Sequence, residues 1–190
     1  MLAESLADAG SESGAAYAEQ LRPFQPADAD FVLARLRYRQ HRIPESAAAL
    51  RRGFLTMRHH PWETVDAMGR SLDVARNLMR SRELAPAMID ALSQPFAAGQ
   101  WEDIRVWYLA IMLRDYESCT PRTIRAIRAM EPWPPWQKEF LKTRRDCYAT
   151  VMLDDLKRRA DEDLEAYASA ERTPLLLTTT STVRLTIPPM

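Results

Sequence analysis

The chain has 190 residues, and its 26 Lys and Arg residues equal its 26 Asp and Glu residues. This balance excludes attraction of the whole molecule to nucleic acid or to an acidic membrane surface. The apolar content of 46% is enough for one domain with a sizeable core. The longest apolar run, Val106 to Leu113, is far shorter than the roughly 20 residues of a membrane span, and Met1 to Ala9 does not resemble a secretory signal. We therefore expect a soluble, cytoplasmic chain.

Residues 1–26 are rich in Ala, Ser, Gly and Glu, which predicts a flexible N-terminal arm with at most a frayed helix over 15–21. The rest of the chain favours helix, because Ala, Leu, Arg and Met outnumber Val and Ile and the 13 prolines fall mostly between segments with helical periodicity. The expected helices cover residues 28–41, 44–60, 61–79, 84–97, 101–115 and 121–130.

The helix expected over 101–115 differs from the others, because apolar residues occupy nearly all of its faces. Such a helix is buried on several sides, so we place it at the centre, with Trp107 or Tyr108 and Ile111 nearly fully buried.

Residues 136–172 contain neither Gly nor Pro and form either one long helix or a hairpin. A turn between Thr150 and Asp155 is favoured, because two acids there suit a helix start. Residues 173–190 are expected to be an irregular tail.

Helix pairs begin near Asp28, Trp62, Trp101 and Trp136, a spacing typical of helical repeats. Ser46, Leu50 and Gly53 match the small, large, small series of the second helix of a tetratricopeptide repeat, which would pack on Leu33 and Ala34. The sequence therefore predicts an all-α fold, an antiparallel helix-hairpin (degenerate tetratricopeptide-like) solenoid of about four pairs, over residues 27–172.

The chain lacks the common nucleotide-binding, metalloprotease and hydrolase motifs, so no catalytic site and no cofactor are expected. His59 and His60 have no further ligands at helical spacing and are interpreted as residues near a helix end, not as a metal site. Cys119 and Cys147 have no metal-like spacing; two reduced thiols are favoured over a disulfide. The helix-start tryptophans are interpreted as packing residues. They are Trp62, Trp101, Trp133 and Trp136.

Charge is unevenly distributed. Residues 35–60 hold seven arginines and one acid, Glu45, whereas residues 154–171 hold seven acids and three basic residues. A solvated surface is one interpretation of the basic segment. The other is a binding face for a protein partner with an acidic segment, which includes the acidic last helix of a second copy. In a tetratricopeptide register the partner-binding residues would be Phe31, Arg35, Tyr38, Arg39 and Arg42.

Short matches to one family are spread along the chain: Pro61-Trp62, Gln94-Pro95-Phe96, Glu131-Pro132, Pro135-Trp136, Phe140-Leu141, Arg144 and Cys147-Tyr148. Over residues 28–170 this series resembles the tetratricopeptide-like helical C-terminal region of bacterial membrane proteins that carry a spermidine-synthase-like domain. In that family aminopropyl transfer belongs to a separate domain with a Gly-rich nucleotide-binding loop, which this chain lacks. The resemblance implies an accessory module beside a membrane or enzymatic partner.

We therefore expect a non-enzymatic scaffold or adaptor that holds another protein, either alone or as a subunit of a larger, membrane-associated assembly. The alternative is an accessory or regulatory module of a spermidine-synthase-like aminopropyltransferase. Nucleic-acid binding through the arginines of residues 35–58 is a third, less favoured hypothesis.

Overall fold

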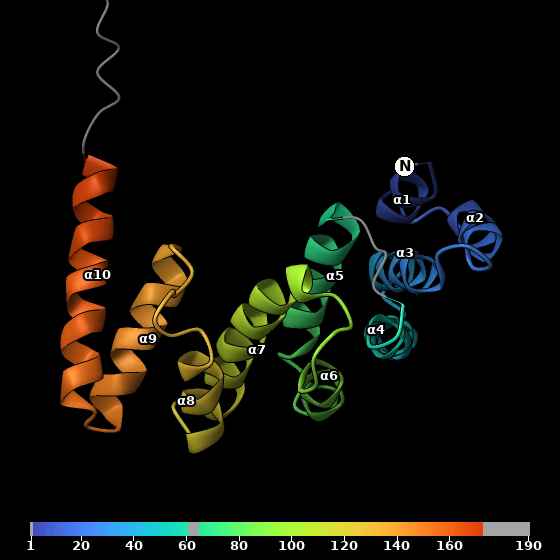
Figure 1. Cartoon of the computed structure of the whole chain (residues 1–190). Helices are drawn as coiled ribbons and strands as arrows, with labels where there is room; N and C mark the ends of the chain where they lie inside the picture. The colour runs from blue at the N-terminus through green and yellow to red at the C-terminus, as the bar shows by residue number, and fades with distance from the viewer. Residues whose placement is uncertain (1, 61–64, 173–190) are drawn as a thin grey trace, which may run out of the picture.

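The structure, a computed structural model, describes residues 2–60 and 65–172, over which it contains helices and no strand. The predicted all-α class is confirmed. The helices follow one another from α1 at one end of the molecule to α10 at the other (Figure 1). Their bounds are α1 Leu2–Asp8, α2 Ser13–Leu21, α3 Pro26–Arg39, α4 Ile43–Met57, α5 Val65–Leu78, α6 Ala85–Leu92, the 3₁₀ helix Gly99–Trp101, α7 Glu102–Glu117, α8 Pro121–Arg128, α9 Lys138–Thr150 and α10 Asp154–Arg172.

Two of the sequence predictions lie outside the described residues: the start of the third helix at Pro61 and Trp62, and the tail over 173–190. Among the helices that are described, none has both the length and the apolar character needed to cross a membrane.

The predicted flexible arm is wrong for residues 2–21, which form α1 and α2 and pack against α3. Ala7 and Ala18 are fully buried in a small core with Val32 and Leu36. Alanine side chains let helix backbones approach closely, but they give little hydrophobic contrast along a sequence. Gly10, with φ 72°, supplies the left-handed residue that ends α1 and turns the chain toward α2.

Helices α3 and α4 pack closely, and the predicted small side chains of α4 make the contact. Ser46 is fully buried, and its Oγ donates to the carbonyl oxygen of Ala34 at 2.8 Å. A Cβ at Gly53 would lie 2.7 Å from Cδ1 of Phe31. The absence of a side chain at Gly53 therefore makes room for the Phe31 ring.

Each later helix packs on earlier ones. Helix α5 contacts α3, α4 and α7, whereas α6 contacts α4 and α7. Helix α7 also contacts α8 and α9, and α9 pairs with α10. One hydrophobic core consequently extends from Ala27 in α3 to Ala160 in α10.

The predicted burial of α7 is correct for Ile111 but wrong for both aromatic residues. Ile111 is buried, whereas Trp107 and Tyr108 are only half-buried. The Tyr108 hydroxyl donates to Oδ1 of Asp73 in α5 at 2.7 Å, so this ring reaches a polar surface between the two helices. A ring that ends in a hydroxyl group commonly keeps that end near polar groups, whereas an aliphatic side chain does not need to.

The predicted hairpin over 136–172 is confirmed, with the turn at residues 151–153 between α9 and α10. Met152 has φ 55°, and the Leu153 amide donates to the carbonyl oxygen of Tyr148 at 3.0 Å. This is the usual helix C-terminal turn with methionine in the place that glycine normally takes. His41 makes the same turn between α3 and α4, with φ 58° and a bond from the Arg42 amide to the Arg37 carbonyl oxygen.

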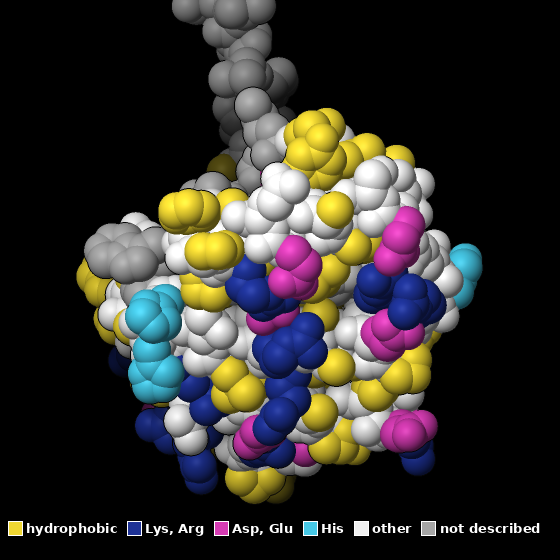
Figure 2. Space-filling view, turned by 90° about the vertical axis from the view of Figure 1, so that its right-hand side faces the viewer, with side chains coloured by type: hydrophobic (Ala, Val, Ile, Leu, Met, Phe, Trp, Pro, Cys, Tyr) yellow, Lys and Arg dark blue, Asp and Glu magenta, His cyan; other side chains and the backbone are white. Residues whose placement is uncertain are grey.

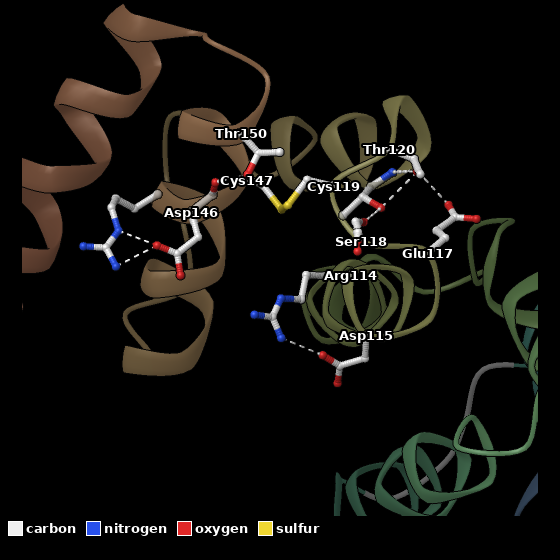
Figure 3. Close-up of a disulfide and its surroundings, with 11 residues drawn as sticks. Arg114, Asp115, Glu117, Ser118, Cys119, Thr120, Asp146, Cys147 and Thr150 are labelled. Carbon is white, nitrogen blue, oxygen red and sulfur yellow. Dashed lines mark hydrogen bonds and ion pairs between the residues drawn. A yellow bond between two sulfur atoms is a disulfide. The ribbon is translucent and has the colours of Figure 1, made fainter.

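The prediction of two reduced cysteines is wrong, because Cys119 and Cys147 form a disulfide with their Cα atoms 5.0 Å apart. Figure 3 shows the bond linking the segment after α7 to α9. Beside it, Thr120 caps α8 by accepting from the Thr123 amide, and Pro121 occupies the first turn, as predicted. The two cysteines are 28 positions apart, and only the packing of α9 beside α7 and α8 brings them together.

The tryptophans do not all pack as predicted. Trp101 is buried, but the side chain of Trp133 is 87% exposed. Trp136 is half exposed, with its ring 5.8 Å from that of Tyr167. Trp133 lies in the connector before α9, where Glu131 rather than the ring makes the contacts to α9.

Candidate functional site

The structure divides the predicted partner-binding residues between the core and the surface. Phe31 is fully buried against Phe54, with ring centroids 5.2 Å apart, so it cannot face a partner as predicted. The reason is the rotation of α3, which turns Phe31 toward the gap left by Gly53. Arg42 lies on the surface after α3 and forms an ion pair with Glu45 at 2.5 Å.

Arg35 is also buried, with only 3% of its side chain exposed. Its Nη1 lies 3.3 Å from Oε1 of Glu4 and its Nε 3.3 Å from Oδ1 of Asp8, both in α1. The acidic segment expected of a partner is therefore supplied, for this arginine, by the protein's own first helix. No hydrogen-bond partner accepts from Nη2 of Arg35 among the described residues.

Most of the other arginines of residues 35–58 donate hydrogen bonds to carboxylates or carbonyl groups of the protein itself. Arg37 contacts Glu12 at 2.7 Å, and hydrogen bonds from Arg37 and Gln40 lower the pKa of Glu12 to about 2. Arg52 pairs with Asp30 at 3.0 Å. Figure 2 shows this end of the molecule: basic side chains run down the middle of the face, and acidic side chains lie directly beside them.

Tyr38 and Arg39, the remaining predicted residues, line a cavity of about 520 Å³ between α1, α3 and α5. A second cavity, of about 550 Å³, lies between α5 and α7. The two cavities share Asp73 and Asn77 of α5 and therefore adjoin, and we call them together the α3–α5–α7 groove. Its lining residues are Asp8, Arg35, Tyr38, Arg39, Arg70, Asp73, Val74, Arg76, Asn77, Met79, Arg80, Met112 and Asp115.

The carboxylates of this groove already have partners. Asp8 pairs with Arg70 at 3.0 Å, and Asp73 accepts from Tyr108. Asp115 accepts from Arg114 at 3.0 Å and lies 3.6 Å from Arg76. Each of these three carboxylates therefore already has a hydrogen-bond or ion-pair partner within the protein.

Several donors of the groove are unused. The side chains of Tyr38, Arg39, Asn77 and Arg80 make no hydrogen bond or ion pair with other described residues. Burial and the hydrogen bond to Asp73 raise the pKa of Tyr108, so the phenol stays protonated as the donor in that contact. The unused groups can donate to carboxylates or to peptide carbonyl groups, and the lining contains no Ser, Cys or His.

Sequence reasoning missed the contribution of α5. Arg70, Asp73 and Asn77 recur at spacings of three and four, which places them along one side of α5, and Arg80 follows three positions later, just past the end of the helix. That polar stripe lies opposite the apolar stripe that predicted the helix. This stripe of polar residues of mixed charge was the signal in the sequence that could have pointed to the groove.

His59 and His60 lie exposed after the end of α4, and the described part of the chain holds no cluster of side chains suited to a metal ion. Comparison of the chain with family models, with curated proteins and with solved structures gives no match. The resemblance to the helical region of spermidine-synthase-like membrane proteins therefore stays a prediction.

Proposed function

We propose that this chain is a non-enzymatic scaffold that holds a protein partner in the α3–α5–α7 groove. The observation that carries the proposal is the imbalance inside the groove: its carboxylates are paired, whereas Arg39, Asn77 and Arg80 have no partner among the described residues. A segment that brings carboxylates or unpaired backbone carbonyls would use these donors. Such a partner has the acidic character expected from the sequence.

The dimensions suit an extended segment. Packed helices are about 8–10 Å apart, so a path from α3 across α5 to α7 is roughly 20 Å long. An extended chain advances about 3.3 Å per residue, and about six residues would therefore cross the groove.

The helix arrangement supports a degenerate tetratricopeptide-like solenoid. In such a solenoid the first helices of successive pairs line one surface, and here α3, α5, α7 and α9 contact one another in that order. The second helices α4 and α6 are also in contact. The pair α5 and α6 is the irregular one, because α6 packs mainly on α4 and α7.

The disulfide bears on location. Disulfides persist in oxidising compartments and are rare where glutathione keeps thiols reduced. The Cys119–Cys147 bond therefore favours a site of action outside the reducing cytoplasm, in contrast to the cytoplasmic location expected from the sequence.

Charge reversal in the groove tests the function. Arg39→Glu/Arg80→Glu should reduce capture of at least one protein from extracts of the native cells by about tenfold or more, measured by quantitative mass spectrometry. Arg51→Glu/Arg159→Glu is the matched control, because both arginines are exposed, lie outside the groove and make no ion pair with described residues. If the wild type, the groove variant and the control variant all capture the same cellular proteins in equal amounts, the groove does not hold the partner.

A further inference from the structure

Helix α8 carries a row of arginines on the outside of the molecule. Arg122, Arg125 and Arg128 follow at intervals of three, and all three are exposed. Among the described residues, the Arg122 side chain makes one hydrogen bond, to Oγ of Ser93 at 3.3 Å. The side chains of Arg125 and Arg128 make no ion pair or hydrogen bond with described residues. This row, here called the α8 arginine row, differs from the arginines of α3, most of which are neutralised by nearby acids.

The helix dipole does not explain the whole row. Basic residues in the last turn interact favourably with the carbonyl end of a helix, which accounts for Arg125 and Arg128. Arg122 lies in the first turn, where a cation is unfavourable. Its presence costs stability unless an anion binds beside it.

An apolar hollow of about 230 Å³ lies beside the row, between α7 and α8. Val106, Leu109 and Leu113 of α7 contribute its aliphatic side chains, and Ala126 and Ala129 of α8 leave it open. Arg122 and Arg125 are part of the same lining. The hollow shares no residue with the α3–α5–α7 groove, so α7 separates two different surfaces.

The size of the hollow limits what can fill it. Pockets for small molecules and cofactors are usually about 300–1,000 Å³, and this one is smaller. A single large apolar side chain is a better match. Three of the surrounding side chains are arginines, and Arg105 already pairs with Glu102 at 2.6 Å. Arg122 and Arg125 therefore remain as partners for acids on either side of that apolar residue.

We propose that the α8 arginine row and the adjoining hollow form a second binding site, for an acidic protein segment anchored by one large apolar side chain. The apolar residue fills the space over Val106 and Leu109, and flanking carboxylates pair with Arg125 and Arg128. The guanidinium groups suit carboxylates because they can bind them in a two-point manner. This site is separate from the α3–α5–α7 groove, and the two sites together would let the chain hold two protein segments at once.

Other ligands fit less well. Single-stranded nucleic acid binds to arginines alongside aromatic rings that stack on bases, and the hollow is lined by aliphatic residues. Membrane-surface helices insert protruding apolar side chains, whereas Leu109 and Leu113 are buried beneath the surface.

Selection from a displayed library of random peptides on the full-length, oxidised protein tests the proposal. We expect enriched sequences with one large apolar residue flanked by acids. Binding of a selected peptide, measured by fluorescence anisotropy, should weaken about tenfold or more in Arg125→Glu/Arg128→Glu. It should weaken similarly in Ala129→Trp, which fills the hollow from an exposed position directly after the end of α8.

Two controls separate this site from the groove. Arg51→Glu/Arg159→Glu and the groove variant Arg39→Glu/Arg80→Glu should bind the selected peptide as the wild type does. Circular dichroism checks that each variant is folded. The proposal is overturned if no selected peptide is sensitive to both α8 variants, or if the sensitive peptides lack acids. It is also overturned if a single-stranded oligonucleotide or vesicles of anionic lipid bind through Arg125 and Arg128 and compete with the peptides.

Discussion

Arg144 of α9 holds Glu131 by two hydrogen bonds, from Nε to Oε1 at 2.6 Å and from Nη2 to Oε2 at 2.9 Å. Its Nη1 also contacts Oδ2 of Asp163 in α10 at 2.5 Å. Tyr148 donates to the same Glu131 carboxylate at 2.7 Å. One buried arginine thus joins the connector before α9 to both helices of the C-terminal hairpin.

Replacing Arg144 by alanine should lower the free energy of unfolding by about 3 kcal/mol, because the change leaves a half-buried Glu131 without its main partner. The side chain of Arg144 is 2% exposed. The side chain of its neighbour Arg145 is 33% exposed and, among the described residues, pairs only with the adjacent Asp146. Arg145→Ala, the matched control, should cost less than about 1 kcal/mol. Urea denaturation measures both, and equal losses would show that the Arg144 network is not needed for stability.

The disulfide should stabilise the fold by roughly 3.5 kcal/mol, the value expected for closing a loop of about 28 residues. Unfolding of the wild type with and without a reductant should show this difference. Cys119→Ser/Cys147→Ser should unfold like the reduced wild type and should not respond to the reductant. Detection of two free thiols in protein purified under oxidising conditions would contradict the bond.

Two helical glycines should respond to alanine in opposite directions. At Gly53 the new methyl group would meet the Phe31 ring, so Gly53→Ala should destabilise the protein by about 1–3 kcal/mol. At Gly69 in α5 an added Cβ would meet no other described part of the structure within 4 Å, so Gly69→Ala should stabilise the protein by about 0.5–1 kcal/mol through helix propensity alone. Thermal or urea unfolding of the two variants is the test. A stabilising Gly53→Ala would mean that α3 and α4 are not packed as described.

Glu12 should make stability depend on acid pH. Hydrogen bonds from Arg37 and Gln40 lower its pKa from 4.5 to about 2 in the folded state, so folding favours the ionised carboxylate. The contribution is complete above about pH 4.5 and is lost as pH falls toward 2. The melting temperature of Glu12→Gln should therefore lie below that of the wild type at pH 6 and approach it near pH 2. Glu162→Gln, at an exposed acid of α10, is the control and should track the wild type throughout.

Several local features of this fold were predictable from the sequence. The cap formed by Thr120 and Pro121 depends only on neighbouring residues, and so does the turn near Asp154. The helical class follows from periodic apolar residues separated by proline. These features involve interactions within one or two turns of chain, which composition and spacing record directly.

Contacts between distant segments were not predictable from spacing. The burial of Phe31 depends on Gly53, and the neutralisation of Arg35 depends on Glu4 and Asp8 in a segment that resembled a flexible arm. The pairing of Cys119 with Cys147 likewise depends on where α9 packs.

The groove, too, has one feature that the sequence determined and one that only the tertiary structure decided. Its members Tyr38 and Arg39 were named from a tetratricopeptide register in the arginine-rich segment, because the sequence by itself determined which arginines cluster along the chain. The tertiary structure alone decided which of those arginines can still bind a partner. Each arginine is neutralised if folding brings a carboxylate within hydrogen-bonding distance of it, and is free if folding does not.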